Sequence, residues 1–342
     1  MNLKDLLEEE KRVVINPLQD ENPPLLVVIT EGSTTLARAL IYRILIDETF
    51  GPNQSIHFIL YDSLNFLAFL ESTAIEITAC APNLLEGISY SADSSIAFKD
   101  ADVVFSIGRA RGYEFTKNER RESFFEEYIH VAKIHGEAIE RFSKKDVKII
   151  TLGYTAARII LQFAKSIPPE NITALSLLTL KITAALIAAK ANRHPSEVIN
   201  LITWGVNGEN SLPDYRYAKF RDGKFVEEEI KNDVWLKKNL IKGVRSASGR
   251  SWYSRSSAYA LADHCKLLWN DTPKGEWTCM AIYSDNSYGV PTGIFFSFPV
   301  YCQNRKYKIV QGLDVSENLK KYMKETARII NEESSIALNA HR

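Results

Sequence analysis

Apolar and polar positions in the first half of the chain predict strands that alternate with helices. The strands are continuous apolar runs of four to eight residues, and the helices show an apolar face at helical spacing. Strands of this kind, separated by helices, are typical of a parallel sheet covered on both faces. The predicted strands and helices are, in order, Leu25–Thr30, Thr35–Ile46, Ser55–Tyr61, Leu64–Ala79, the strand "DVVFSIG", Arg121–Ser143 and the strand "VKIITLG".

The pattern changes after residue 172. An apolar helix, Leu175–Ala191, precedes the strand "VINLITWG", two further helices, three strands that look antiparallel and a closing helix from Ser316. This order predicts a second, α+β domain. Prolines interrupt the first 24 residues. We therefore expect an arm at 1–24, a parallel α/β domain at 25–172 and an α+β domain at 173–342.

Composition and charge narrow the class of partner. The 342 residues contain 42 Lys plus Arg and 42 Asp plus Glu, so no net charge attracts nucleic acid or an anionic membrane. The cysteines are far apart and form no CxxC pair, which indicates a reducing compartment and no metal site. They are Cys80, Cys265, Cys279 and Cys302.

The chain start and the longest apolar run argue against export or membrane insertion. The start, "MNLKDLLEEEKRVV", is charged throughout and lacks the zones of a signal peptide. The apolar run from Ile172 is interrupted by Lys181 and closed by Lys190, so we interpret it as a buried helix. We expect a cytoplasmic protein that binds no nucleic acid, membrane or metal.

The turn after the first predicted strand is the first candidate for chemistry. A strand, a short turn and a helix open a dinucleotide-binding unit, whose turn needs glycine so that the backbone can approach phosphate. The turn here is Glu31-Gly32-Ser33-Thr34-Thr35, and Asp62 ends the second strand, where an acidic residue accepts bonds from ribose. Gly32 and Asp62 are therefore cofactor-binding candidates. In the alternative interpretation, the residues from Gly32 to Thr34 only make the turn and cap the helix.

The order of these landmarks resembles the malate and lactate dehydrogenase superfamily, from Leu25 to Ala340. The chain is similar above all to cytosolic malate dehydrogenase, and the segment "VINPLQ" resembles its divergent 1B branch. The most specific stretches are "AFKDADVVFSIG", "SIPPENITAL", "LWNDTPKGEW" and "YSDNSYGVPTGIFFSFPV". The resemblance implies an N-terminal Rossmann-type parallel sheet that binds NAD, and a lactate/malate dehydrogenase C-terminal-like α+β domain. It also implies hydride transfer at C2 of malate, a histidine base, an aspartate that orients it and arginines for the carboxylates.

Several of the implied functional positions carry other residues here. The resemblance places Glu31 and Thr34 at the two turn glycines, Thr179 at the aspartate, Ile182 at an arginine and Asn207 at the histidine. Loss of a general base alone removes roughly 10² to 10⁴ in rate. The catalytic positions Thr179 and Asn207 are therefore degenerate, and no catalytic residue is expected.

The substrate positions are altered as well. Ala157 stands where the resemblance implies a substrate-binding asparagine. Arg121 matches the second arginine of the substrate loop and is a substrate-binding candidate, while Arg109 or Arg111 would supply the first. The loop is about three residues longer than the family pattern. No histidine lies between Gly205 and Arg245 to replace the base.

These departures favour a malate dehydrogenase-like pseudoenzyme that acts as a structural or interaction protein, with no cofactor. The resemblance to the 1B branch implies ciliated or sperm cells and a place in the axoneme of a cilium or flagellum. Partner contacts are expected at the arm and at the segment Arg109–Glu122. The helices Leu64–Ala79 and Leu175–Ala191 would form a homodimer or bind a different protein.

Two alternatives stay open. The chain would be an active NAD-dependent malate dehydrogenase or related 2-hydroxy acid oxidoreductase with an altered active site, whose proton acceptor is Asp62, Glu209 or Tyr113. It would otherwise be a binding module that keeps a nucleotide, an interpretation supported by Asp62 alone.

Overall fold

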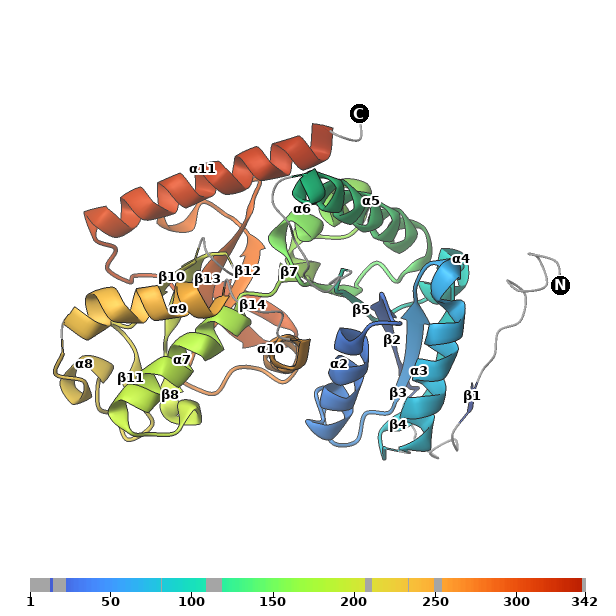
Figure 1. Ribbon diagram of the computed structural model, residues 1–342, viewed down its shortest axis with the longest axis horizontal. Helices are drawn as coiled ribbons and strands as arrows, with labels where there is room; N and C mark the ends of the chain where they lie inside the picture. Colours follow the sequence, from blue (N-terminus) through green and yellow to red (C-terminus); the bar gives the residue numbers. More distant parts are fainter. Residues whose placement is uncertain are drawn as a thin grey trace.

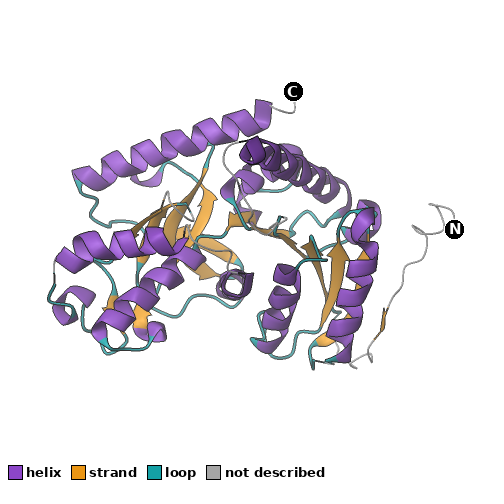
Figure 2. Ribbon diagram, in the orientation of Figure 1, coloured by secondary structure: helices purple, strands orange, loops and turns teal. Residues whose placement is uncertain are grey.

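One mixed sheet runs through the molecule (Figures 1 and 2). The computed structural model describes residues 13–14, 23–80, 82–108, 119–206, 211–232, 234–248 and 254–339; for 13–14, 119–127, 248 and 254 the backbone alone is described. Six of the described strands are parallel and follow the order β4-β3-β2-β5-β6-β7. They are β2 (Leu25–Thr30), β3 (Ile56–Tyr61), β4 (Leu85–Ser91), β5 (Val103–Ser106), β6 (Lys148–Thr151) and β7 (Ile172–Ala174).

This strand order is that of a doubly wound dinucleotide-binding sheet, so the predicted α/β class with a Rossmann-type sheet is confirmed. Neighbouring residues of β2 point to opposite faces, as the pleat requires. Val27 and Ile29 join the core under α2, α3 and α10, whereas Val28 joins the core under α4, α5 and α6. The helices of the first face are α2 (Thr35–Ile46), α3 (Leu67–Ala79) and α10 (Ser254–Trp269), and those of the second face are α4 (Ser94–Ala97), α5 (Glu119–Phe142) and α6 (Tyr154–Phe163).

The sheet continues into the second half of the chain because β7 also pairs antiparallel with β12. The expected domain boundary at 172/173 falls inside β7. The strands beyond it are β12 (Thr278–Tyr283), β13 (Phe295–Gln303), β9 (Ile202–Gly205), β10 (Ser211–Asp214) and β14 (Lys306–Ile309). A small separate sheet holds β8 (Val198–Ile199) and β11 (Lys219–Phe220), and β1 (Val13–Val14) pairs with the edge of β4.

Helices of the second half enclose this antiparallel part. They are α7 (Leu177–Ala191), α8 (Val226–Glu229), α9 (Leu240–Ser248) and α11 (Glu317–Asn339), with the short turns η1 (Leu64–Phe66), η2 (Pro169–Asn171), η3 (Pro195–Glu197), η4 (Trp235–Asn239) and η5 (Ser287–Gly289). Figure 1 shows α11 running along the molecule toward α5 and α6. The Tyr154 hydroxyl at the start of α6 donates to Glu333 of α11 and joins the two halves. In the part of the chain that the structure describes, no helix combines the length and apolarity needed to cross a membrane.

Several elements differ from the sequence prediction, which placed no helix at α6 and no strand at β7 or β10. The segment around "GISYSA" forms the full strand β4. The predicted strand "VINLITWG" is two strands, because Asn200 adopts a left-handed φ of 59° and its side chain accepts from Trp277 N at 3.1 Å. The helix predicted from Leu64 begins with one 3₁₀ turn before α3.

Helices α5 and α6 cross so closely at Gly136 that one added methyl group should lower stability. A Cβ on Gly136 would lie 2.9 Å from Phe163 Cβ and 3.1 Å from Ile160 Cα. We expect Gly136→Ala to lower the free energy of unfolding by roughly 1–3 kcal/mol through overpacking, measured by chemical denaturation. Gly243→Ala is the control, since its Cβ would meet only a flexible Leu186 methyl at 3.2 Å. A helical alanine there leaves stability unchanged or raises it by up to about 1 kcal/mol. Equal effects at both positions would contradict this account of the crossing.

Candidate functional site

The carboxyl ends of the parallel strands meet at one edge of the sheet. In open α/β sheets, ligands bind in the crevice outside this edge. The turn after β2, Asp62 after β3 and Ser106 at the end of β5 all lie there. The cofactor-binding candidates Gly32 and Asp62 therefore lie at the edge where a ligand of such a sheet binds.

The turn after β2 is built without the two glycines that the family resemblance implies. Glu31 adopts a left-handed φ of 46°, which costs a residue with a side chain roughly 1–2 kcal/mol. Thr34 has an ordinary φ of −84°, and its hydroxyl caps α2 by accepting from Ala37 N at 3.2 Å. Gly32 has a packing role, because a Cβ would lie 2.8 Å from Leu60 Cβ on β3.

The Glu31 side chain lies inside the protein rather than in solvent. It is 4% exposed, and its Oε2 accepts from the Thr30 hydroxyl. Its Oε1 lies 3.5 Å from His135 Nε2, and the other ring nitrogen, Nδ1, lies 3.0 Å from Ser106 Oγ. We call these four residues the Glu31 cluster. It connects β2, β5 and α5 at the carboxyl edge.

Burial lowers the pKa of His135 to about 3, so the imidazole is neutral near pH 7. A carboxylate only accepts, so the tautomer that suits Glu31 has its ring proton on Nε2 and leaves Nδ1 to accept from the Ser106 hydroxyl. Tyr61 packs edge-on against the imidazole with ring centroids 5.8 Å apart. Burial raises the pKa of Tyr61 to about 12, and the nearby charges of Glu31 and Asp62 add to the shift. The environment of the cluster is therefore dry and negative.

Asp62, the candidate for binding ribose, is engaged by the protein itself. Ser33 Oγ donates to Asp62 Oδ2 at 2.5 Å, and Ser63 N donates to Oδ1 at 2.8 Å. The side chain is buried, with an exposed fraction of 3% for the residue. A ribose hydroxyl would have to displace Ser33 to reach this carboxylate.

These residues do not fit a dinucleotide. A second negative charge 4 Å from the Glu31 carboxylate would be repelled by about 4 kcal/mol at an effective dielectric of 20. The turn also has no glycine at positions 31 and 34, where the resemblance implies the residues that let a phosphate approach the backbone. The edge supplies carboxylates where a diphosphate requires N–H donors.

The substrate side shows no ionised replacement at the described positions. Thr179 on α7 is 1% exposed, and its carbonyl accepts from Thr183 Oγ1 at 2.8 Å. Ile182 packs against the apolar core of α7, α8 and α9, and Ala157, which belongs to α6, is fully buried. The remaining candidates lie outside the residues whose side chains are described: Arg109, Arg111, Tyr113, Arg121, Asn207 and Glu209.

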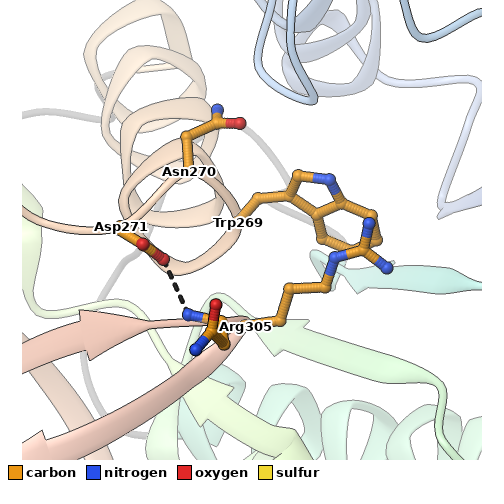
Figure 3. Close-up of a pocket in the computed structure, with 5 residues that line it drawn as sticks. Trp269, Asn270, Asp271 and Arg305 are labelled. Atoms are coloured by element: carbon orange, nitrogen blue, oxygen red, sulfur yellow. Dashed lines mark hydrogen bonds between the residues drawn. The ribbon is translucent and has the colours of Figure 1, made fainter.

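Two other features could have offered chemistry. Within the described ranges, no group of three His, Cys, Asp or Glu residues could hold a metal ion. A surface pocket of about 450 Å³ lies between the end of α10 and the β13–β14 turn (Figure 3). The Arg305 guanidinium lies 3.8 Å from the Trp269 ring centroid there, and Trp269 packs on Phe50 in the segment before β3. The pocket is therefore at the opposite, amino edge of the parallel strands.

The buried imidazole predicts a measurable loss of stability in acid. An unfolded histidine binds a proton below about pH 6.5, whereas folded His135 binds one only near pH 3. Stability attributable to His135 is therefore complete above pH 6.5 and falls by about 1.4 kcal/mol per pH unit below it. Glu31, Ser106, Tyr61 and Phe98 face the ring.

Replacement by glutamine should remove this contribution, so His135→Gln reduces the slope of unfolding free energy between pH 6 and 4.5 by about that amount. Denaturant unfolding at several pH values measures it. His194→Gln, which changes an exposed histidine, is the comparison variant. An unaltered slope in His135→Gln would show that the imidazole is already protonated in the folded protein.

Comparison with known proteins agrees with the fold and the sequence landmarks. The lactate/malate dehydrogenase alpha/beta C-terminal domain matches residues 180–339. Cytoplasmic malate dehydrogenase of Rattus norvegicus is 33% identical over 330 residues, covering 92% of this chain and 97% of the relative. The Homo sapiens protein is 32% identical with the same coverage.

Solved structures give the same answer. Malate dehydrogenase from Naegleria fowleri superposes with a TM-score of 0.83 at 27% identity, over 93% of this chain and 99% of that one. Trichomonas vaginalis lactate dehydrogenase in complex with NADH and oxamate has a TM-score of 0.84 at 24% identity, over 92% of this chain and 98% of that one, and supports the fold alone. With sequence relatives above 30% identity over nine-tenths of its length, the chain belongs to the malate/lactate dehydrogenase family.

Proposed function

We propose that this family member has lost dinucleotide binding and hydride transfer and acts as a structural or interaction protein of the cytoplasm. The observation that carries the proposal is the buried Glu31 carboxylate in the turn where a diphosphate would lie. A carboxylate at this place repels phosphate, and its contacts with Thr30 and His135 hold it there.

The catalytic positions support the same proposal. Thr179 cannot orient a histidine as an aspartate does, because a hydroxyl carries no charge to stabilise an imidazolium. Ala157 is an apolar core residue. By sequence, the base position is Asn207, which does not accept a proton near neutral pH.

The cellular setting is a further part of the proposal. The cytoplasmic names of the relatives support a cytoplasmic protein. The 1B-like segment "VINPLQ" supports the axoneme of a cilium or flagellum. Tagged protein in ciliated cells should then remain with detergent-extracted axonemes, and release with the soluble fraction would count against this location.

An active dehydrogenase with a displaced base and altered substrate is the second candidate. The identity of 33% over 92% of the chain favours it, since the relatives are named malate dehydrogenases. It requires a dinucleotide to enter despite Glu31 and a new proton acceptor within hydrogen-bond reach of the substrate.

Cofactor binding decides between the two candidates. We expect the purified chain to show no heat of NAD or NADH binding by calorimetry up to about 1 mM ligand, equivalent to a binding free energy weaker than about −4 kcal/mol. We also expect no oxidation of NADH with oxaloacetate or other 2-keto acids above heat-treated protein. Cytoplasmic malate dehydrogenase is the positive control. Micromolar binding, or turnover lost on heating, would establish the second candidate instead.

The partner surface gives a separate prediction. Helix α3 exposes Phe69 (60%) and Ile75 (58%), whose burial in a dimer would stabilise it by about 1.5–3 kcal/mol for each side chain. We propose a homodimer, or a complex with another protein, through the helices Leu64–Ala79 and Leu175–Ala191. Sedimentation equilibrium should show a dimer that Phe69→Lys with Ile75→Lys converts to a folded monomer, with the circular dichroism spectrum of the natural chain. Ile336→Lys on α11, also at an exposed residue, is the matched control. If the natural chain is a monomer, the homodimer is ruled out and a complex with a different protein remains.

A further inference from the structure

Helix α5 presents two polar side chains to the carboxyl edge of the sheet. Tyr128 and His135 are seven residues apart, close to two helical turns, and so share one face of the helix. His135 reaches the ends of β2 and β5 through Glu31 and Ser106. Tyr128 reaches the segments that follow β5 and β6, as the glycines there show.

The Tyr128 ring lies directly against two glycines. A Cβ on Gly108, after β5, would be 2.9 Å from Tyr128 Cε2, and a Cβ on Gly153, after β6, would be 2.6 Å from the hydroxyl oxygen. Any side chain at either position would collide with the ring. The absence of side chains at these strand ends therefore accommodates a tyrosine from the protein itself.

The Tyr128 hydroxyl also lies at the start of α6. The backbone N–H of Ala156, one of the first-turn groups that have no partner inside a helix, is near enough to oppose the rise that burial causes in the pKa of Tyr128. Gly153, the N-cap of α6, provides no side-chain bond. Tyr128 thus covers the start of α6 from another helix. A helix start at the carboxyl edge is otherwise a ready site for an anionic ligand.

The Glu31 cluster does the same at the other end of the edge. The turn before α2 would offer N–H groups to a diphosphate, but the Glu31 carboxylate now lies beside it. His135 and Thr30 partner that carboxylate, and Ser33 partners Asp62. The side chains of Glu31, Asp62 and His135 at the strand ends are therefore engaged within the chain.

We propose that His135 and Tyr128 of α5 are resident occupants of the dinucleotide crevice and exclude the cofactor jointly with Glu31. The inference rests on the proposed loss of cofactor binding and extends it. The turn alone does not account for the exclusion, because restoring its glycines leaves the α5 side chains across the strand ends. To open the crevice, substitutions are needed both in the turn between β2 and α2 and on α5.

The contact between Glu31 and His135 is tested first, without any cofactor. Glu31→Gln, His135→Gln and the double variant form a cycle in which the unfolding equilibrium constant is measured by denaturant titration. Residues in one buried polar cluster are coupled, so we expect a deviation from additivity of about fivefold or more. The matched cycle combines Glu31→Gln with His57→Gln. His57 is also buried, and its Nε2 lies 3.0 Å from a serine hydroxyl, that of Ser89. That cycle should be additive within about twofold.

Cofactor affinity is tested second, by NADH fluorescence and calorimetry. Glu31→Gly with Thr34→Gly restores the turn, and a second protein adds His135→Ala and Tyr128→Ala. We expect the second to bind NADH at least tenfold more tightly than the first. The control adds His57→Ala and Tyr42→Ala to the restored turn and gains nothing. Tyr128→Phe keeps the ring in the crevice and removes only the hydroxyl. We expect this variant to have a lowered thermal midpoint and no gain in NADH affinity.

The outcomes separate the inference from the proposed function. NADH binding by the natural chain would overturn the exclusion, even if the stability cycle still showed the Glu31–His135 coupling. If the turn-restored protein and the variant with all four substitutions bound NADH equally, the role of α5 would be overturned. The proposed loss of cofactor binding by the natural chain would be unaffected. An additive Glu31–His135 cycle would remove His135 as a partner of the carboxylate.

Discussion

The carboxyl edge of this sheet depends on the contacts that the buried Glu31 carboxylate makes with Thr30 and His135. The Glu31 backbone is in the left-handed region, and an ionised carboxylate in a dry interior is costly unless it is hydrogen-bonded. The Thr30 hydroxyl and the His135 ring provide partners, and Ser106 in turn orients the ring. One side chain therefore fixes the relative positions of β2, β5 and α5.

The same edge differs from an enzyme crevice in how its polar groups are satisfied. A binding crevice keeps donors and carboxylates free for its ligand, and these groups are hydrated when the ligand is absent. Here Asp62 is bonded to Ser33, and the Tyr128 hydroxyl lies against Gly153 at the start of α6. Since the contacts are internal, they stabilise the fold at every ligand concentration, whereas a ligand would stabilise it only in proportion to its occupancy. A scaffold of this kind is suited to a role that needs a constant shape.

Local pattern accounts for much of the fold and little of the site. The strand Leu25–Thr30 and the helix Thr35–Ile46 follow from apolar periodicity and from the Thr34 cap, and both have the predicted bounds. The break at Asn200 depends on a bond to Trp277, far along the chain, which no local pattern contains. Glu31 was recognisable as a lost glycine, but its partner His135 lies on a helix three strands later in the sequence. Tyr128 likewise looks like an ordinary helical residue until the glycines after β5 and β6 are brought beside it.

The two halves of the molecule are joined by the sheet itself, and this limits how the crevice could open. Strand β7 pairs with β6 and with β12, so the parallel and antiparallel parts share one hydrogen-bonded framework. The Tyr154–Glu333 bond adds a second link, from the start of α6 to α11. The contact of Tyr128 and the link to α11 thus meet at the start of α6. A motion that withdrew α5 from the edge would uncover the start of α6, to which α11 is also attached. Closure of the crevice and the union of the two halves are therefore parts of one structural arrangement.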